Sequence, residues 1–376
     1  MKPVFKKTLR PIVRKETSIE VHLNGLTTEL DDADGKIFDL IELMDGTRTT
    51  KQLALSLNIT EDDIHSAVLA LNDLGFIEDS AVPPTYSETE LERYQANLNY
   101  FSGYASLDTS KYSFQDRLRN SKVAVLGMGG GSLAAAYLAG LGVGEIVGVD
   151  FDTVERTNLN RQFLYNENDI GNLKSRAAEQ KLRLINPDIT VTIHNKEITG
   201  YKELLPLIKG ANAVITMMDQ PAIQAFRWVN AACYILGIPF YMGGFNNQSI
   251  MWERRVPSHQ DPCYDCKLLD SLESDPDNAY RLTASYGKVF SQVNTGFAPN
   301  LSILTGLFIS DAVKMITGIA PISKPQIQVD TSTMEINQTD YPFDSKAYCP
   351  TCSGKRQQLA DLDEMIRIAK IREVSI

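Results

Sequence analysis

Long apolar runs are absent from this sequence of 376 residues, since no stretch reaches the roughly 18 apolar residues that a membrane-spanning helix requires. The most apolar stretch, around residues 301–309, soon meets Asp311 and Lys314. The N-terminal segment MKPVFKKTLRP has cations but neither an apolar core nor a cleavage site, which excludes a secretory signal peptide. We therefore expect no membrane association and a cytoplasmic location.

Basic charge and cysteine are also scarce. With 37 Lys and Arg against 47 Asp and Glu, the formal net charge is −10, which argues against broad binding to nucleic acids or anionic membranes. Five cysteines are too few for a chain of this length to be a disulfide-stabilised secreted scaffold, and four of them fall in two Cys-x-x-Cys pairs. The length instead allows a large hydrophobic core and two or three domains.

The sequence does contain a strand, a glycine turn, a helix and a second strand that ends in an acid. Residues 123–126 are predicted to form a short buried strand and residues 133–141 a helix, and the glycines between them let the backbone approach a phosphate. Those glycines are Gly127, Gly129, Gly130 and Gly131. Asp150 ends the strand predicted over residues 145–150, where a dinucleotide-binding fold places a ribose-binding carboxylate. This segment predicts a nucleotide pocket that suits either ATP or a nicotinamide cofactor.

Polar side chains follow where a polyphosphate would extend, namely Asn158, Arg161, Gln162 and Lys174. Taken alone, Arg161 and Lys174 fit solvated cations on a helix face equally well, and it is their clustering after Asp150 that favours a phosphate site. Asp219 ends the apolar strand AVITMM, at the carboxyl edge where open α/β sheets bind ligands. It is either a helix cap or, beside a triphosphate, a magnesium ligand.

The two Cys-x-x-Cys pairs, whose inner cysteines are 83 positions apart, predict a zinc site. Four thiolates satisfy tetrahedral zinc and leave no position for water, so we expect a structural site, with a redox pair as the less favoured alternative. The ligands would be Cys263, Cys266, Cys349 and Cys352. The fifth cysteine, Cys233, lies in the helical pattern AACYIL and is expected to be a small buried core residue.

Residues 1–82 are predicted to form a domain of their own, followed by a linker over residues 83–92 that begins with Pro83 and Pro84. Strands over residues 19–23 and 27–30 flank the hairpin signal Asn24-Gly25, and residues 12–13 supply another strand. Apolar periodicity predicts helices over residues 34–43, 50–57 and 61–74, the last with Thr60 as its N-cap. A small hairpin with three helices is typical of a winged-helix domain.

Three roles are open for this domain. DNA binding is disfavoured because residues 1–80 contain nine basic and fifteen acidic residues, and a helix that begins Glu61-Asp62-Asp63 would repel phosphate. The other two roles are a purely structural appendage and capture of an extended peptide, which would add a strand to the exposed hairpin edge. The residues alone do not rank these two.

After the linker, residues 93–352 alternate strands and helices, which predicts an α/β domain with a Rossmann-like, mostly parallel sheet and helices on both faces. Helices are expected over residues 91–101, 174–185 and 223–236, and strands over residues 189–194 and 213–217. The remaining residues, 353–376, form a tail in which the stretch 357–376 is either an amphipathic helix or a solvated segment.

Together these motifs resemble the ubiquitin-activating-type (ThiF/MoeB-like) adenylyltransferases over about residues 93–352. The resemblance rests on VLGMGGG, the acids Asp150 and Asp152, NLNRQ, INPDI, the MMD that ends in Asp219, and the paired Cys-x-x-Cys. It implies ATP as the bound nucleotide, with Asp150 on the ribose and Asp219 on Mg²⁺. The other nucleotide contacts would be Gly127, Gly129, Gly130, Asp152, Asn158, Arg161, Gln162 and Lys174.

The same resemblance implies a chemistry. A substrate carboxylate would attack the α-phosphate of ATP to give an acyl-adenylate and pyrophosphate, while Arg161, Lys174 and the metal held by Asp219 stabilise the developing charge. Residues 267–348 contain no cysteine, although thioester-forming members of the family have their nucleophile in this region. Ubiquitin-like thioester transfer is therefore not expected.

A winged-helix domain ahead of an adenylyltransferase resembles the leader-binding enzymes that modify ribosomally made precursor peptides, notably those of microcin C and pantocin A biosynthesis. Local matches to the microcin C enzyme are Arg93-Tyr94, DPCYDC at residues 261–266 and FAPN at residues 297–300. The resemblance implies a short peptide as the partner, clamped by the first domain, with residues 267–300 over its reacting end. It also implies a homodimer.

Two positions depart from the family pattern. Ala96 stands where a second arginine, three residues after Arg93, is usually supplied across a dimer interface to the phosphates, so phosphorylation of the carboxylate stays open beside adenylation. Ser132 replaces the last glycine of the turn, which is a milder change because serine can cap a helix.

The expected function is therefore ATP-dependent activation of a carboxylate on a precursor peptide in antibiotic biosynthesis. In the pantocin-like version a glutamate side chain is activated, and backbone attack then closes a ring with loss of water. In the microcin-like version the peptide's C-terminus is adenylated, and Ala96 makes the first version the favoured one. Alternatives are activation of a sulfur-carrier protein, a nicotinamide oxidoreductase and a scaffold that binds peptide and nucleotide without turnover.

Overall fold

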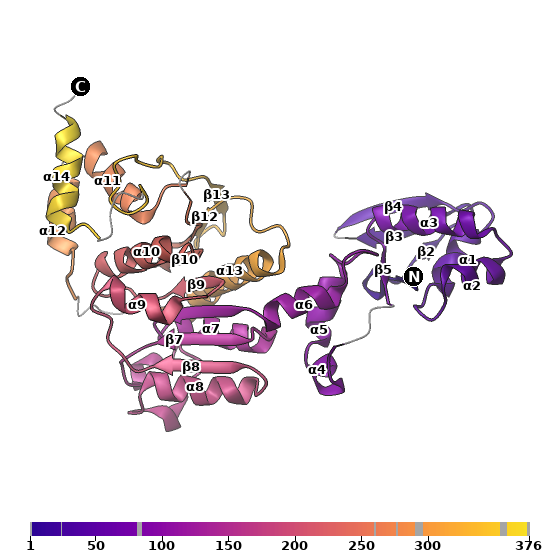
Figure 1. Ribbon diagram of the computed structural model, residues 1–376, viewed down its shortest axis with the longest axis horizontal. Coiled ribbons are helices and arrows are strands. Elements are labelled where there is room, and N and C mark those ends of the chain that lie inside the picture. Colours follow the sequence, from indigo (N-terminus) through magenta and orange to yellow (C-terminus); the bar gives the residue numbers. More distant parts are fainter. Residues whose placement is uncertain are drawn as a thin grey trace. The chain divides into compact units, whose positions relative to one another are not determined.

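The structure, a computed structural model, describes residues 2–23, 25–80, 85–258, 261–275, 277–289, 296–353 and 359–373. The chain forms two compact units, Met1–Arg117 and Leu118–Ile376 (Figure 1). The boundary predicted at Pro83 and Pro84 lies outside the described residues, so the division into residues 1–82, 83–92 and 93–352 stays a prediction. Within the described ranges, none of the helices has both the length and the apolarity needed to span a bilayer.

Two small antiparallel sheets and three helices make up most of the first unit. Strand β1 (Pro3–Phe5) pairs with β5 (Ile77–Asp79), and β3 (Ser18–Leu23) lies between β2 (Val13–Arg14) and β4 (Leu26–Asp31). A short 3₁₀ turn, η1 (Lys7–Leu9), follows β1, and the helices are α1 (Lys36–Leu43), α2 (Thr50–Leu57) and α3 (Glu61–Asp73). Both hairpin strands and all three helices are confirmed, while Asn24 of the hairpin signal lies outside the described residues.

Threonine caps and apolar faces explain the helices of this unit. The Thr49 and Thr60 side chains accept hydrogen bonds from the backbone at the starts of α2 and α3, as N-caps do. Helix α3 buries its apolar face, made of Ile64, Val68 and Leu71, in the core of this unit. The core also contains a charged group, Lys6, whose Nζ donates to the carbonyls of Gly75 and Ala105 at 2.7 Å.

The helix predicted over residues 91–101 is wrong as a single element. Two helices, α4 (Glu88–Arg93) and α5 (Gln95–Ser102), meet at Tyr94, whose backbone angles of −96° and 12° are not helical. A capping box between Ser87 and Glu90 starts α4 before the apolar pattern begins, and the buried Tyr94 ring fixes the break. Helix α6 (Lys111–Arg119) then leads to the second unit.

The second unit contains an eight-stranded sheet in the order β13-β12-β11-β10-β9-β6-β7-β8. Strands β8, β7, β6, β9 and β10 are parallel, and β11, β12 and β13 extend the sheet in antiparallel fashion (Figure 1). The strands are β6 (Lys122–Leu126), β7 (Glu145–Val149), β8 (Thr190–His194), β9 (Ala213–Thr216), β10 (Phe240–Phe245), β11 (Ser249–Arg255), β12 (Gln326–Asp330) and β13 (Ile336–Thr339). The predicted α/β class with a mostly parallel sheet is confirmed.

Helices cover both faces of this sheet. The helices of this unit are α7 (Gly131–Leu141), α8 (Lys174–Ile185), α9 (Tyr201–Ile208), α10 (Gln224–Leu236), α11 (Tyr264–Ser274), α12 (Asn278–Ser285), α13 (Ala298–Thr317) and α14 (Leu362–Glu373), with the 3₁₀ turns η2 (Arg156–Asn158) and η3 (Glu167–Asp169). Successive side chains of a strand point to opposite faces, so Val125 of β6 faces α7 while Ala124 and Leu126 join the core with α9 and α10. Helix α14 confirms the helical alternative for the C-terminal tail over its described part.

The strand order reverses direction between β6 and β9. From β6 the chain proceeds outward through β7 and β8, and then returns to the other side of β6 to form β9 and β10. The carboxyl ends of β6, β7 and β9 lie at one edge, since Leu126 pairs with both Val149 and Thr216. Parallel α/β sheets bind ligands outside such a reversal, so the fold itself marks this edge.

Candidate functional site

The glycine turn follows β6 at this edge and is held by the acid that follows β7. Gly127 adopts a left-handed conformation with φ of +88°, which only glycine reaches without strain. The Met128 amide then donates to one carboxylate oxygen of Asp150 at 2.7 Å, and the Asp152 amide donates to the other at 2.9 Å. Burial raises the pKa of Asp150, and the charge of Lys174 opposes this rise. Each oxygen of Asp150 retains a further lone pair for a ligand hydroxyl.

Lys174 begins α8 and turns its buried side chain back toward the same edge. Its Nζ donates to the Asp152 carboxylate at 2.9 Å, and its own amide donates to the Asp152 carbonyl at 2.8 Å. Buried beneath the turn is Tyr165, whose hydroxyl donates to the Met128 carbonyl at 2.8 Å. Burial raises the pKa of Tyr165 far above its usual range, which keeps the hydroxyl a donor. Sequence reasoning missed this residue, since a lone aromatic in a polar stretch signals little.

Gln162 packs against the glycine turn and has an unused acceptor. A Cβ at Gly129 would lie 3.2 Å from Nε2 of Gln162 and 3.9 Å from Nζ of Lys174, so glycine at this position lets the Gln162 side chain pack close against the turn. The Gln162 side chain is buried, and its Oε1 has no hydrogen-bond partner among the residues that the structure describes. A buried acceptor without a partner is costly, and a ligand donor would satisfy it. The backbone amides of the turn, the charge of Lys174 and the unpaired acceptor of Gln162 form a set of groups that suits a nucleotide.

The other two predicted contacts, Asn158 and Arg161, lie on and after the turn η2. The Asn158 side chain is buried and accepts from the Glu155 amide at 3.0 Å, so its oxygen shapes the turn. Arg161 donates to the Thr157 carbonyl at 2.9 Å and to Asn160 at 2.8 Å. Partial burial lowers the pKa of Arg161, but the guanidinium stays charged and has further donors.

Asp219 follows β9, across the strand reversal from the glycine turn, and its side chain is exposed. Its surroundings raise its pKa through partial loss of water, the charge of Asp152 adds to the rise, and that of Lys174 reduces it. Asp152, Lys174 and Asp219 therefore form one electrostatic cluster. Lys174 pairs with Asp152, and the further carboxylate of Asp219 leaves the cluster net negative, as a site for a divalent cation and phosphate oxygens would be.

The two residues that depart from the family pattern lie in ordinary environments. Ser132 is buried in α7 and donates to the Gly129 carbonyl at 2.7 Å, so its hydroxyl closes the turn from below. Ala96 is exposed on α5 of the first unit, and Arg93 ends α4.

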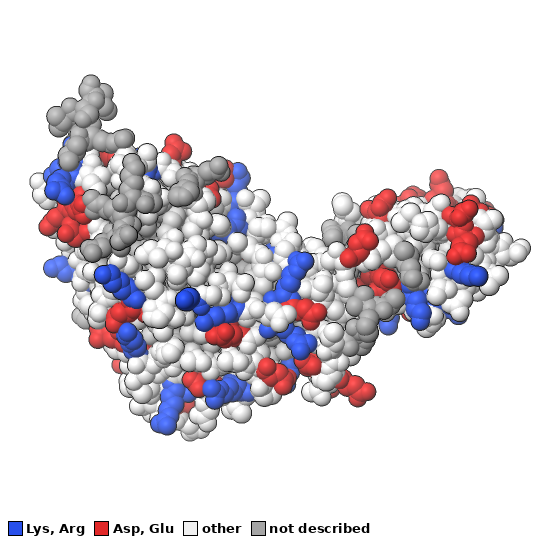
Figure 2. All heavy atoms as spheres, viewed as in Figure 1, with Lys and Arg blue, Asp and Glu red and all other residues white. Residues whose placement is uncertain are grey.

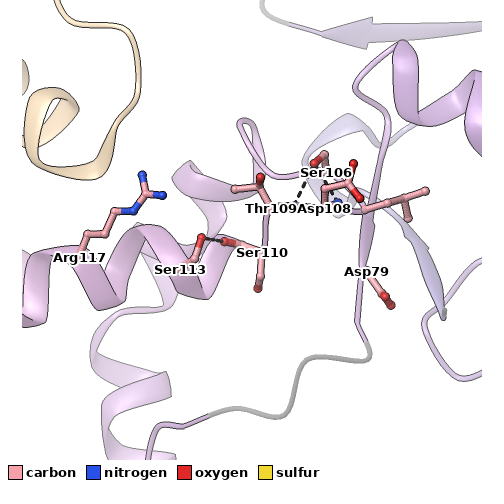
Figure 3. Close-up of a pocket in the computed structure, with 8 residues that line it drawn as sticks. Asp79, Ser106, Asp108, Thr109, Ser110, Ser113 and Arg117 are labelled. Atoms are coloured by element: carbon pink, nitrogen blue, oxygen red, sulfur yellow. Dashed lines mark hydrogen bonds between the residues drawn. The ribbon is translucent and has the colours of Figure 1, made fainter.

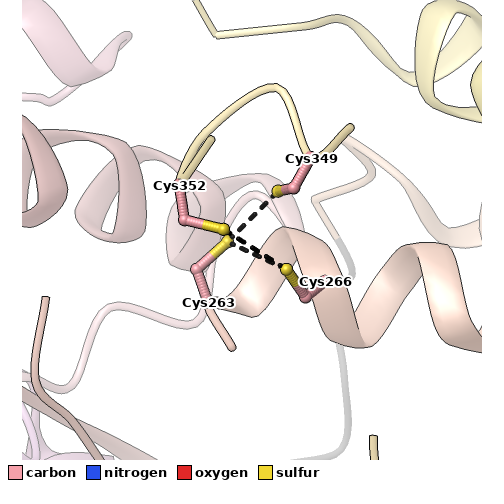
Figure 4. A group of neighbouring side chains, drawn as sticks. All are labelled: Cys263, Cys266, Cys349 and Cys352. Atoms are coloured by element: carbon pink, nitrogen blue, oxygen red, sulfur yellow. Dashed lines mark hydrogen bonds between the residues drawn. The ribbon is translucent and has the colours of Figure 1, made fainter. Parts of the chain in front are cut away.

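Four cysteine thiols converge at the start of α11 (Figure 4). Their sulfurs lie within 4.8 Å of one another, with separations of 3.5 Å between Cys263 and Cys349 and 3.4 Å between Cys266 and Cys352. Tetrahedral zinc with bonds of about 2.3 Å places sulfurs about 3.8 Å apart, so the four buried thiols could hold zinc. The Lys346 amide also donates to Cys266 at 3.4 Å. Cys233 is fully buried in α10, as predicted for a core residue.

A hollow of about 330 Å³ lies elsewhere, in the first unit, between α6 and the loop before it (Figure 3). Its lining consists of hydroxyl groups, two carboxylates, an arginine and a leucine: Asp79, Ser106, Leu107, Asp108, Thr109, Ser110, Ser113 and Arg117. None of the predicted nucleotide or metal residues lines it. The glycine turn therefore stays the candidate site.

Residues 100–351 match the ThiF family. The chain is 32% identical over 223 residues to the sulfur carrier protein ThiS adenylyltransferase of Escherichia coli, an alignment that covers 58% of this chain and 81% of that protein. Its fold is similar to Escherichia coli MccB, solved with AMPCPP and MccA, with a TM-score of 0.73, 24% identity and coverage of 94% of this chain and all of that one. PaaA is also similar, with a TM-score of 0.62, 24% identity and coverage of 74% and 92%.

Proposed function

Because this chain belongs to the ThiF family of ATP-dependent adenylating enzymes, we propose that it activates a carboxylate of a ribosomally made precursor peptide. The family assignment confirms the resemblance found in the sequence and favours ATP over a nicotinamide cofactor. The observation that supports a peptide substrate is how much of this chain each of two similar proteins covers. The sulfur-carrier enzyme aligns with 58% of this chain, whereas MccB, solved with a peptide, covers 94% of it.

The first unit would bind the leader part of the peptide. We infer a winged-helix domain from its three helices and the β2-β3-β4 sheet. Among the described residues, β4 is an edge strand of that sheet. An extended peptide can add a strand to such an edge, with backbone hydrogen bonds providing affinity. Acidic side chains are prominent on this unit in Figure 2, which together with the charge of residues 1–80 speaks against a DNA phosphate backbone.

The glycine turn would hold ATP in the second unit. Asp150 would accept a hydrogen bond from a ribose hydroxyl. The turn of Gly127, Gly129 and Gly130 would face the phosphates. The buried Oε1 of Gln162 would accept a hydrogen bond from the nucleotide. Arg161 and Lys174 would lie along the phosphates with Asn158 shaping their turn.

The proposed reaction transfers the adenylyl group of ATP to the peptide, and positively charged side chains stabilise its transition state. The peptide carboxylate attacks the α-phosphorus, the bond to the β-phosphate oxygen breaks, and pyrophosphate leaves. Lys174 and Arg161 stabilise the negative charge that develops, in a site where Asp152 already orients the lysine. Asp219, with Asp152, would hold Mg²⁺, which shields the phosphate charge when bound.

The four clustered cysteines would bind Zn²⁺ as a structural ion. All four positions of a tetrahedral ion would be filled by protein sulfur, so no open position is left for chemistry. We further infer a cytoplasmic enzyme that acts as a homodimer, following its family.

A glutamate side chain is the carboxylate that we favour, with subsequent backbone attack and net loss of water. Ala96 supports this choice, because the arginine that usually stands at this position would contact the triphosphate in C-terminal adenylation, and alanine cannot. For the same reason, phosphorylation of the carboxylate is the competing activation step. Activation of a sulfur-carrier protein is the second candidate, favoured by the identity to the ThiS enzyme.

Incubation with Mg²⁺-ATP and a candidate precursor peptide tests the proposal. Mass spectrometry of the peptide and chromatography of the nucleotide would show loss of one water for cyclisation or gain of a nucleotide for C-terminal adenylation, with AMP or ADP identifying the activation step. Two matched peptides separate the reacting groups: glutamate replaced by glutamine blocks only the first reaction, and a C-terminal amide blocks only the second. Adenylation of a folded carrier protein, with every peptide unchanged, would refute the proposal.

A further inference from the structure

A buried carboxylate within the first Cys-x-x-Cys pair contacts the second pair. Asp265 stands between Cys263 and Cys266 and has no exposed surface. Its Oδ2 accepts from the hydroxyl of Thr351 at 2.6 Å, and Thr351 stands between Cys349 and Cys352. Asp265 therefore joins the two pairs from behind, independently of any metal.

Asp265 also binds a buried arginine from a different part of the sheet. Nε and Nη2 of Arg227, in α10, donate to its two oxygens at 2.7 and 3.0 Å. Both side chains are fully buried, so removal of either partner would leave an uncompensated charge. Nη1 of Arg227 donates in addition to the hydroxyl of Tyr286 at 2.8 Å, and the guanidinium carbon lies 5.8 Å from the centre of the Tyr286 ring.

Tyr286 directly follows α12 and leads into a segment that pairs with the loop after Asp219. The amide of Gly287 donates to the carbonyl of Ala222 at 3.2 Å, and the amide of Ala222 donates to the carbonyl of Lys288 at 3.0 Å. Ala222 is three residues after Asp219, and only Ile223 separates it from α10. Two backbone hydrogen bonds thus hold the Asp219 loop against residues 287–288, next to the Tyr286 side chain.

We propose that Arg227 and Tyr286 are positioning residues that transmit the geometry of the cysteine cluster to the Asp219 loop. The path is continuous: Thr351 and Asp265 at the cysteine pairs, Arg227 in α10, Tyr286 after α12, and the paired backbone of Ala222. The inference rests on the proposed function for the role of Asp219 in Mg²⁺ binding, but the path itself is independent of it. The cysteine site would thereby set the metal affinity of the nucleotide site as well as the stability of the C-terminal part.

Hydrogen exchange of the full-length protein, followed by mass spectrometry, tests the path without reference to activity. Tyr286→Phe keeps the ring but removes the acceptor of Arg227, and Thr351→Val removes a donor to Asp265 while leaving all four cysteines. A hydrogen bond to a charged group is strong enough for its loss to speed local opening about tenfold or more. We expect that acceleration at the Ala222 and Gly287 amides in both variants, with the amides of β6 and β7 unchanged. Tyr280→Phe, an exposed residue of α12, is the matched control and should change nothing.

The Mg²⁺ dependence of ATP turnover supplies the functional readout. In both variants, the Mg²⁺ concentration that gives half-maximal ATP turnover should rise about tenfold, while the turnover rate at saturating Mg²⁺ should change much less. A general loss of folding would instead lower the rate at saturating Mg²⁺. Unchanged exchange at Ala222 in either variant overturns the inference. Accelerated exchange in a protein that consumes no ATP with any substrate would support the path and place the failure in the proposed function.

Discussion

Replacement of Lys174 by methionine would separate its role in catalysis from its role in folding. The methionine keeps most of the buried aliphatic stem and removes the charge. That charge pairs with Asp152 at 2.9 Å, but the Asp152 side chain is 52% exposed, so the ion pair contributes only about 0–1 kcal/mol to stability. The free energy of unfolding of Lys174→Met, measured by urea titration, should therefore lie within about 1 kcal/mol of the wild-type value.

The effect on the reaction should be much larger. A preorganised donor aimed at charge that develops in a transition state contributes about 3–4 kcal/mol, which corresponds to a rate loss of about 100- to 1000-fold. ATP binding should suffer less, because Asp152 already neutralises part of the lysine charge and must share it with the phosphate. We expect Kd for ATP, measured by calorimetry, to rise about tenfold or less while kcat falls about 100-fold or more.

Lys181→Met is the matched control. Lys181 lies seven residues further along α8 and pairs with Asp169 at 2.7 Å, so the same chemical change removes a similar ion pair about two helical turns from the glycine turn. The control should retain kcat. The reasoning is refuted if Lys174→Met keeps kcat within about threefold of wild type, or if Lys181→Met loses as much.

Other predictions concern the metals and the turn. Elemental analysis should find one zinc per chain, lost in Cys352→Ser with a destabilisation above about 3 kcal/mol, whereas Cys233→Ser should keep the metal. Gly131→Ala should cost about 1–3 kcal/mol in urea unfolding, because its Cβ would meet a valine methyl group of β6 at 2.7 Å, while Gly140→Ala in the same helix meets nothing within 4 Å and should be neutral or stabilising. Since the pKa of Asp219 is raised and only its ionised form binds Mg²⁺, the Mg²⁺-dependent rate should fall on acidification at a higher pH than for an ordinary aspartate, and Asp219→Asn should abolish Mg²⁺ activation.

Each of these has a definite contrary result. Zinc retained in Cys352→Ser would show that the cysteines are not its ligands. Equal stabilities of the two glycine variants would mean that α7 moves freely relative to β6. An acid limb that survives in Asp219→Asn would assign the titration to another group.

Local patterns predict much of this fold. The strand before Gly127 and the helix after Lys174 follow from apolar runs and 3.6-residue periodicity, and the cysteine cluster follows from the spacing of its pairs. The division of one predicted helix at Tyr94 does not, because a capping box and a buried ring outweigh the apolar period.

Contacts between distant segments could not be predicted in this way. Three such contacts depend on the tertiary fold, which brings distant segments together. They are the ion pair of Lys174 with Asp152, the hydrogen bond of Tyr165 beneath the turn, and the burial of Lys6 against two carbonyls. Arg227 illustrates the limit, since its partners lie 38 and 59 residues away and no periodicity marks it as buried. Such contacts are a property of the assembled sheet rather than of any segment.

The spacing of the cysteine pairs also affects how the protein unfolds. The chain between Cys266 and Cys349 contains most of α11, all of α12 and α13, and strands β12 and β13, of which β13 is at the edge of the sheet. An ion held by all four thiols would close this stretch into a ring, and closing a ring of about 80 residues removes several kcal/mol of conformational entropy from the unfolded chain. Unfolding must then either release the ion or retain the ring, so the unfolding rate should depend on the rate at which a chelator captures the metal.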